Sequence, residues 1–335
     1  MRRGLLGAAV VAALVVAGAG QPAQAAPAAA QVTLLGASEG GVVVSRAGQV
    51  FTGAEGAALV RRPELESSLL DDQAPTVLGV AGNSVAWYEN GLFGSTDIVH
   101  RMDVRTGADV VDGTMTTPLA FTGTAWYSDI LTEVDAVPPP PITLRQYPVQ
   151  ADPSLPFTTV AAMPGGTATA FAADRDTAVR AWYEQNADGS RTYRVALIDL
   201  STGLITSLAE GTPDAITRVA IGSGAVAWTT EGVDGLQIHR RTLADAPVTT
   251  FVETGTLVAG AELVLSQGRI GYLVSSPQGA QLRLVTGSTS RTVALPTGSA
   301  GLASDGPNFV TAAGAWVYAV PAVGVAQIRR VARIP

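Results

Sequence analysis

Four acidic residues follow apolar segments at similar positions in this chain, and their side chains are its best candidates for chemistry. Each lies two or three residues after a tryptophan; they are Glu89, Asp129, Glu184 and Glu231. If the segments are repeats, the four carboxylates begin equivalent loops on one face of the fold. Such a rim could bind Ca²⁺ through oxygen ligands, bind a cationic group of a partner, or hold two carboxylates for glycoside hydrolysis. The remaining interpretation is that acidic residues keep the loop entrances hydrated.

Other residue types that carry out catalysis are scarce. The chain has only two histidines, His100 and His239, and each precedes an arginine in a predicted strand, where we expect a surface imidazole rather than a general base. The segment Gly36–Gly40 matches G-x-S-x-G by letters, but a strand is predicted at Val42–Val44, where a nucleophile elbow needs a helix. No cluster of histidines is present to hold zinc. The sequence therefore predicts no catalytic residue set.

One pattern recurs along the chain and predicts its fold. A short apolar strand, a turn and a second apolar strand, often ending in an aromatic residue, precede a polar loop, a third strand and a short fourth strand. From Trp87 onward, the second-strand aromatics are spaced by 39, 56, 46 and 44 residues. A propeller blade takes about 40–45 residues, and loops absorb the longer step. We predict an all-β fold, a single β-propeller of about seven four-stranded blades; six or eight blades also fit the spacing.

The polarity of the individual strands agrees with this architecture. The second strands are apolar at consecutive positions, as in Val85–Trp87, which is typical of a strand covered on both faces. The third strands alternate in polarity, as in Arg101–Val104. A turn with aspartate first and glycine last follows them, as in Asp199–Gly203. The aspartate can bond to the backbone of the turn, and glycine tolerates the positive φ of a tight reversal.

The triplet Val-Ala-Trp at 85–87, the polar loop with Asp97 and Ile98, and the Asp-x-x-Thr-Gly turn resemble the blades of TolB-like β-propellers. These are a broad group of bacterial exported or periplasmic repeat proteins. The resemblance covers nearly the whole mature chain and implies blades without implying an activity. TolB-like propellers usually have six blades, whereas seven units are counted here. The first and last units lack both motifs, and Pro138–Pro141 replaces the turn in the third unit.

The N-terminus has the order of a secretory signal peptide. Arg2 and Arg3 precede an apolar stretch, Leu5–Ala17, and small residues at Ala23–Ala25 form an A-x-A site. The apolar stretch is shorter than the roughly 20 residues that a membrane helix needs. We predict a signal peptide at 1–25 and a propeller domain at 26–335, with no membrane span after cleavage. The predicted blades are at about 31–75, 76–118, 119–160, 161–213, 214–257, 258–300 and 301–335.

Charge and composition narrow the classes of partner. The chain has 28 acidic residues and 21 arginines, with no lysine; without Arg2 and Arg3 the net charge is −9. A negative surface repels phosphate backbones, so we expect no nucleic acid partner. No cysteine is present, which excludes disulfides and thiolate metal sites.

Together these features predict a non-enzymatic binding or scaffold propeller. We expect it to be secreted or located in the cell envelope or periplasm and to be a monomer. Its expected partner is an envelope protein, a peptide or a glycan, and no cofactor is expected unless the rim carboxylates bind Ca²⁺. The alternative is a secreted hydrolase or lyase that uses those carboxylates.

Overall fold

A computed structural model gives the fold of the chain in the segments named at the end of this paragraph. The predicted signal peptide at 1–25 lies outside the described residues. No helix among the described residues is long and apolar enough to cross a membrane. The described residues are 33–37, 41–44, 50–53, 57–60, 67–69, 76–81, 84–90, 97–103, 108–115, 118–130, 141–149, 157–211, 218–232, 235–244, 247–258, 263–297, 299–304, 308–313 and 316–322.

In these segments the chain forms seven antiparallel sheets of four strands each, which confirms the predicted all-β propeller. The first three blades, in chain order, contain β2 (Gly41–Val44), β3 (Val50–Gly53), β4 (Ala57–Val60) and β5 (Ser67–Leu69); β6 (Thr76–Ala81), β7 (Ser84–Asn90), β8 (Asp97–Asp103) and β9 (Ala108–Met115); and β10 (Pro118–Phe121), β11 (Ala125–Ile130), β12 (Ile142–Pro148) and β13 (Thr158–Met163).

The next three blades have the same strand order. They contain β14 (Gly166–Asp174), β15 (Thr177–Gln185), β16 (Arg191–Asp199) and β17 (Ile205–Gly211); β18 (Val219–Gly222), β19 (Ala225–Gly232), β20 (Gly235–Thr242) and β21 (Thr249–Glu253); and β22 (Val264–Ser266), β23 (Arg269–Ser276), β24 (Gly279–Thr286) and β25 (Thr289–Ala294). The seventh blade contains β26 (Ser299–Ser304), β27 (Asn308–Ala313), β28 (Trp316–Pro321) and β1 (Thr33–Ala37).

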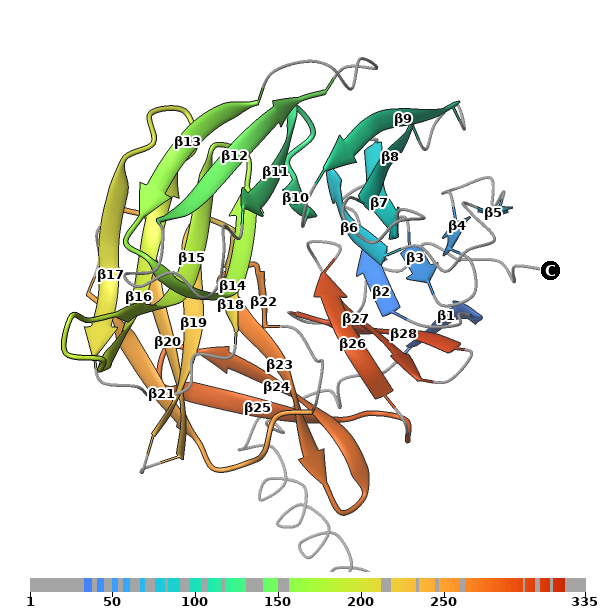
Figure 1. Ribbon diagram of the computed structural model, residues 1–335. Coiled ribbons are helices and arrows are strands. Elements are labelled where there is room, and N and C mark those ends of the chain that lie inside the picture. Colours follow the sequence, from blue (N-terminus) through green and yellow to red (C-terminus); the bar gives the residue numbers. More distant parts are fainter. Residues whose placement is uncertain are drawn as a thin grey trace, which may run out of the picture.

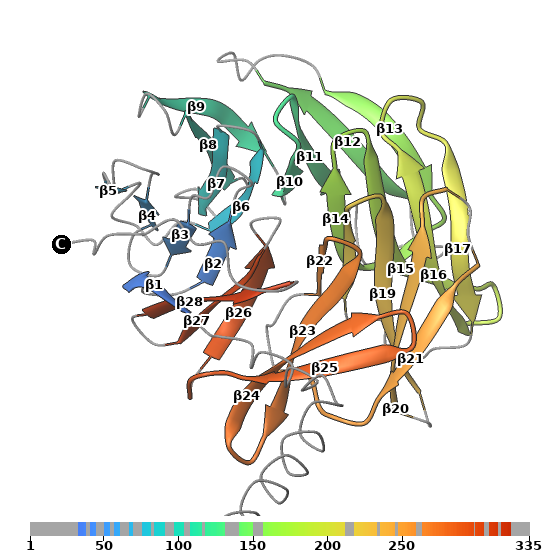
Figure 2. The same cartoon turned by 180° about the vertical axis from the view of Figure 1, so that it is seen from behind.

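The blades surround a central axis, as Figure 1 and the view from behind in Figure 2 show. The first strand of each blade contacts the first strand of the next, in the order β2, β6, β10, β14, β18, β22 and β26. The strand β26 also contacts β2, so the ring of first strands is closed.

The N-terminal strand β1 belongs to the last blade, because it pairs antiparallel with β28. Thr33 lies opposite Ala319 and Ala37 opposite Trp316. The sequence pattern instead predicted this segment in a first blade at 31–75 and a last fourth strand at 328–331; the latter residues lie outside the described part. The pattern also predicted Val42–Val44 as a second strand, whereas β2 is a first strand. Pairing between the two ends of a chain leaves no local sequence pattern.

The second strands are covered on both faces, as predicted. In β15, Ala178–Trp182 is buried without interruption, and in β19, Ala225–Thr230 is buried in the same way. The residues of β15 alternate between two hydrophobic clusters. Trp182 packs with residues of the third blade, and Ala181 packs with Trp228 of the fifth. The fourth blade is therefore held by side chains on both of its faces.

The turn after the third strand of the fourth blade has the predicted chemistry. Asp199 Oδ1 accepts hydrogen bonds from the backbone N–H groups of Ser201 at 2.9 Å and Thr202 at 3.0 Å. Gly203 has a φ of 73°. The Ser201 hydroxyl also donates to Asp199 Oδ1, at 2.6 Å. This hydroxyl bond, followed by the two backbone bonds, lowers the pKa of Asp199. The similar turn at 104–107 lies outside the described residues.

The strand bounds also give the extent of the blades. The second blade spans 76–115 and the fourth 166–211, against sequence-based borders of 76–118 and 161–213. The third blade begins at Pro118 and ends at Met163, which extends beyond 119–160 at both ends.

Candidate functional site

The four predicted rim carboxylates lie within the second strands and not in the loops that follow. Glu89 is in β7, Asp129 in β11, Glu184 in β15 and Glu231 in β19. The expectation that they begin loops was therefore wrong, because each strand continues for at least one residue beyond the carboxylate. For Glu89 only the backbone is described, opposite Ile98.

The position of each carboxylate relative to its tryptophan decides which neighbouring blade it faces. Successive side chains of a strand point to opposite faces of the sheet. Trp126 packs with the second blade, whereas Tyr127 packs with the fourth. The tryptophan face is thus the face toward the preceding blade. Glu184, two residues after Trp182, lies on that face. Asp129, three residues after its tryptophan, lies on the opposite one. The same alternation puts Glu231, three residues after Trp228, with Asp129, so the three carboxylates whose side chains are described do not share one face.

Asp129 is buried between the third and fourth blades, where it forms an ion pair with Arg180 of β15. Both residues are 2% exposed. Burial raises the pKa of Asp129, and the charge of Arg180 opposes this shift. Burial lowers the pKa of Arg180, opposed in turn by Asp129. The guanidinium also lies 5.5 Å from the centre of the Phe171 ring on β14. Asp129 is therefore a contact between blades and is closed to a ligand from solvent.

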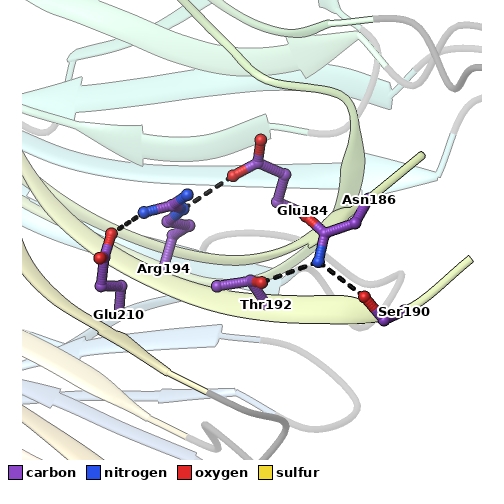
Figure 3. A network of polar contacts seen from close by, with 6 residues as sticks. All are labelled: Glu184, Asn186, Ser190, Thr192, Arg194 and Glu210. Carbon is purple, nitrogen blue, oxygen red and sulfur yellow. Dashed lines mark hydrogen bonds and ion pairs between the residues drawn. The ribbon is translucent and has the colours of Figure 1, made fainter. Parts of the chain in front are cut away.

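Glu184 belongs to a network on the surface of the fourth blade, shown in Figure 3. Its Oε2 accepts a hydrogen bond of 2.7 Å from Arg194 Nε on β16, and another nitrogen of Arg194 pairs with Glu210 of β17. Beside this row, Asn186 Nδ2 donates to Ser190 Oγ at 2.9 Å and to Thr192 Oγ1 at 3.0 Å. Glu184 is thus paired within its own blade, where it shares the guanidinium of Arg194 with Glu210.

The remaining predicted carboxylate, Glu231, is exposed. Its position opposite Leu236 is close to the end of β19. Within the part of the chain that the structure describes, no three His, Cys, Asp or Glu side chains come close enough to hold a metal ion. Among the three predicted carboxylates whose side chains are described, Asp129 and Glu184 are engaged in separate ion pairs and Glu231 is exposed.

Two buried carboxylates that were not among the sequence-based candidates join neighbouring blades. Asp112 of β9 accepts a hydrogen bond of 2.8 Å from the indole nitrogen of Trp126 in the third blade, and it also pairs with Arg101 at 3.0 Å. Glu253 of β21 accepts a hydrogen bond of 2.8 Å from the hydroxyl of Tyr272 in the sixth blade. The available signal was an acidic residue directly after two apolar residues of a fourth strand, as in Val110–Asp112 or Phe251–Glu253.

Glu253 has two further partners. Arg283 Nε lies 3.2 Å from its Oε2, and the backbone N–H of Gly255 donates to its Oε1 at 2.8 Å. Burial, followed by the bond to Glu253, raises the pKa of Tyr272 well above its usual range. The tyrosine is therefore a neutral donor to a carboxylate, which fixes the orientation of the fifth blade against the sixth.

The expectation of surface imidazoles was wrong for His100, which is 8% exposed, and His239 is half-buried. The two histidines occupy equivalent third-strand positions and stack on the second-strand tryptophans. His100 lies 5.1 Å from Trp87, and His239 lies 5.2 Å from Trp228, between ring centres. In each pair the tryptophan lies directly opposite the histidine on the neighbouring strand. The indole ring covers the imidazole through this cross-strand contact, which accounts for its burial.

His239 is bonded on both ring nitrogens. Nε2 lies 2.8 Å from Thr230 Oγ1 and Nδ1 lies 3.0 Å from Thr250 Oγ1. Burial lowers the pKa of His239. Because the described partners are two hydroxyl groups and an indole ring, this imidazole is held as part of the blade.

Comparisons with known proteins agree with the fold. No family model and no curated protein sequence matches the chain. Among solved structures, the β-propeller domain of the Trilobed protease from Pyrococcus furiosus is similar with a TM-score of 0.60 and 6% identity, over 88% of this chain and 97% of that one. A chain from the crystal structure of the Mitotic Checkpoint Complex gives a TM-score of 0.54 and 14% identity, over 88% and 93%.

A third similar structure comes from a study of two prolyl endopeptidases, with a TM-score of 0.57 and 16% identity. This likeness covers 84% of the present chain but 46% of the endopeptidase chain. At such identities the three likenesses show the β-propeller fold alone. The Pyrococcus furiosus propeller has an open velcro topology, whereas in the present chain β1 pairs with β28.

Proposed function

We propose that this chain is an exported binding or scaffold propeller of the cell envelope, which holds a protein, peptide or glycan partner on its surface. The observation that carries the proposal is the use of the candidate catalytic carboxylates in the framework. Asp129 is paired with Arg180 and Glu184 with Arg194. Both side chains are engaged in ion pairs of the framework, and Asp129 is also buried between two blades, so neither is free to serve as a catalytic group.

Location in the cell envelope or outside the cell is proposed from the charged, apolar and A-x-A segments at 1–25. The TolB-like resemblance of the blades agrees with export. The similar chain in the Mitotic Checkpoint Complex is part of a protein complex, which supports a binding role here, because a propeller is a rigid scaffold that presents loops at its surface.

The alternative is a secreted hydrolase or lyase. It is favoured by the exposed carboxylate of Glu231 and by the likeness to propellers found in a protease and in prolyl endopeptidases. In those endopeptidases the similar region is about half of the chain.

One experiment separates the two functions. The purified chain is immobilised, partners are captured from an envelope extract, and each captured molecule is incubated with free chain and analysed by mass spectrometry. A binding propeller returns its partner unchanged. An enzyme converts it, and a triple variant with glutamine at Glu89, Glu184 and Glu231 retains the capture while the conversion stops. Reproducible conversion of the partner by the wild-type chain, but not by the triple variant, would reject the non-enzymatic proposal.

The same preparation tests whether the rim binds Ca²⁺. A ligand that binds only the folded state raises the melting temperature as its concentration exceeds the Kd. A rim that binds Ca²⁺ would melt at higher temperature in millimolar calcium than in chelator, and the triple glutamine variant would lose the difference. Equal melting temperatures would end the calcium proposal.

A further inference from the structure

Among the described strands, the outer strand of each blade pairs along one edge with its sheet neighbour and along the other edge with no strand. Natural sheets protect such edges with bulges, charges or very short strands. The outer pairs of the second, third and fourth blades are interrupted between Val99 and His100, between Leu144 and Arg145, and between Val195 and Ala196. The outer strand β21 of the fifth blade pairs with β20 without interruption, from Thr249 to Glu253.

One face of β21 is fixed on the sixth blade. Phe251 packs against the hydrophobic cluster that contains Tyr272, and Glu253 accepts the hydroxyl hydrogen bond of the same tyrosine at 2.8 Å. Glu253 is 4% exposed. Because these contacts hold the backbone of β21 in place, its outer edge is ordered before a partner arrives, which reduces the entropy lost on binding.

The other face of the β20–β21 hairpin exposes apolar side chains. Leu243 is 40% exposed, Val248 43% and Val252 49%. These are three of the six large apolar side chains that the described residues expose. Val252 lies in β21 and Val248 directly precedes the strand; the two flank Thr250, whose hydroxyl is bonded to His239, so the valines occupy alternate positions on one side. Arg241, the charged residue described on this face of the hairpin, is half-buried.

The neighbouring unbulged edge, β25 of the sixth blade, differs in its side chains. Its exposed residues include Thr289, Ser290 and Thr292, and Arg291 adds a charge. The combination of a regular edge and exposed valines is therefore a property of β21 among the outer strands whose side chains are described.

We infer that the outer edge of β21 binds an extended segment of a protein partner as a fifth strand of the blade. Unpaired backbone N–H and C=O groups are met best by another extended backbone, and exposed residues at alternate positions select the side chains of the added strand. Val248 and Val252 select apolar, β-branched or aromatic residues. A charged residue opposite them would lose hydration without an opposite charge. This inference rests on the proposed binding function and names the surface and the partner class.

The test compares the wild-type chain with Val252→Lys, which adds a charge at the edge, and with Val252→Thr, which keeps the branched shape. The matched control, Ser290→Lys, adds the same charge to the edge of β25. Both lysine positions are exposed, so all variants are expected to keep the wild-type circular dichroism spectrum and melting temperature. The probes are the protein partners captured from envelope extract and linear peptides selected on the wild-type chain from a random display library.

We expect selected peptides with apolar residues at alternate positions. Val252→Lys weakens their binding by about tenfold or more, whereas Ser290→Lys and Val252→Thr change it little. Hydrogen exchange of the backbone amides in 249–253 slows when the peptide binds, and exchange in 289–294 is unchanged.

The outcomes separate this inference from the proposed function. Envelope partners that bind wild type and Val252→Lys equally would overturn the β21 site and leave the binding function in place. Peptide binding without slower exchange in 249–253 would also overturn it. If the wild-type chain captures neither partner nor peptide, both proposals fail. A dimer of the chain that Val252→Lys dissociates would show that a second copy occupies the edge, and would overturn the inference of a different protein partner.

Discussion

The indole nitrogen of Trp126 donates a hydrogen bond of 2.8 Å to Asp112, across the junction between the second and third blades. Trp126 is 1% exposed and Asp112 is 8% exposed. The same relation joins Tyr272 to Glu253 between the fifth and sixth blades. In both cases a fourth-strand carboxylate accepts from the second-strand aromatic residue of the next blade, and an arginine balances its charge. These contacts specify which blade faces which.

Asp112→Ala tests the first of these contacts. The substitution leaves the buried indole N–H of Trp126 and the guanidinium of Arg101 without their carboxylate, and an unsatisfied buried donor costs about 1–3 kcal/mol. We expect the free energy of unfolding in urea to fall by an amount of that order. The control is Thr114→Ala on the same strand, where the side chain is exposed. Equal losses in the two variants would contradict the role of Asp112.

The ion pair between Asp129 and Arg180 makes a second prediction. Removing one partner leaves a buried charge, so Asp129→Ala or Arg180→Ala alone is expected to cost about 3–5 kcal/mol. The double variant Asp129→Leu, Arg180→Met removes both charges and fills the space with apolar groups, and we expect it to recover most of that loss. Urea unfolding of the three variants measures this. A double variant less stable than either single one would contradict the account.

The parts of the fold that could be predicted from sequence are those with a local cause. Burial of Ala225–Trp228 follows from consecutive apolar residues, and the turn at Asp199–Gly203 follows from side-chain bonding and positive φ. The pairing of β1 with β28 could not be predicted, because it joins residues about 280 positions apart through backbone groups that every residue has.

The candidate site was harder to predict than the fold, and Asp129 and Glu184 show why. Successive side chains of a strand point to opposite faces, so offsets of two and three residues from a tryptophan place the carboxylates against different blades. The arginine partners add a second difficulty. Arg194 lies near Glu184 along the chain, but Arg180 is 51 residues from Asp129 and meets it only when two blades pack.

His239 gives a prediction for the pH dependence of stability. Its pKa is lowered in the folded state by burial, so the unfolded chain takes up the proton first as pH falls. Its contribution to stability is present above the unfolded pKa, about 6.5, and is lost as the pH falls through the lower folded pKa. We expect the free energy of unfolding to decrease from pH 7 to pH 5. His239→Asn, which cannot take up this proton, is expected to show a smaller decrease. An unchanged slope in this variant would reject His239 as a cause.

Gly203 combines a positive φ of 73° with close packing against the neighbouring blade. A Cβ added at this residue would lie 2.1 Å from the carbonyl oxygen of Val160 in the third blade. Gly189 has a similar φ of 82°, but nothing lies within 4 Å of its added Cβ. The left-handed conformation alone costs a residue with a Cβ about 1–2 kcal/mol, so Gly189→Ala measures backbone strain without the contact.

We expect Gly203→Ala to lower the free energy of unfolding by clearly more than Gly189→Ala, because the β13 backbone of the third blade must move to accept the methyl group. Urea unfolding of the two variants gives the difference, and that difference is the part due to contact between the third and fourth blades. If the two substitutions lower the free energy of unfolding equally, the turn at Asp199–Gly203 only reverses the chain. Its contact with the third blade then does not stabilise the fourth blade.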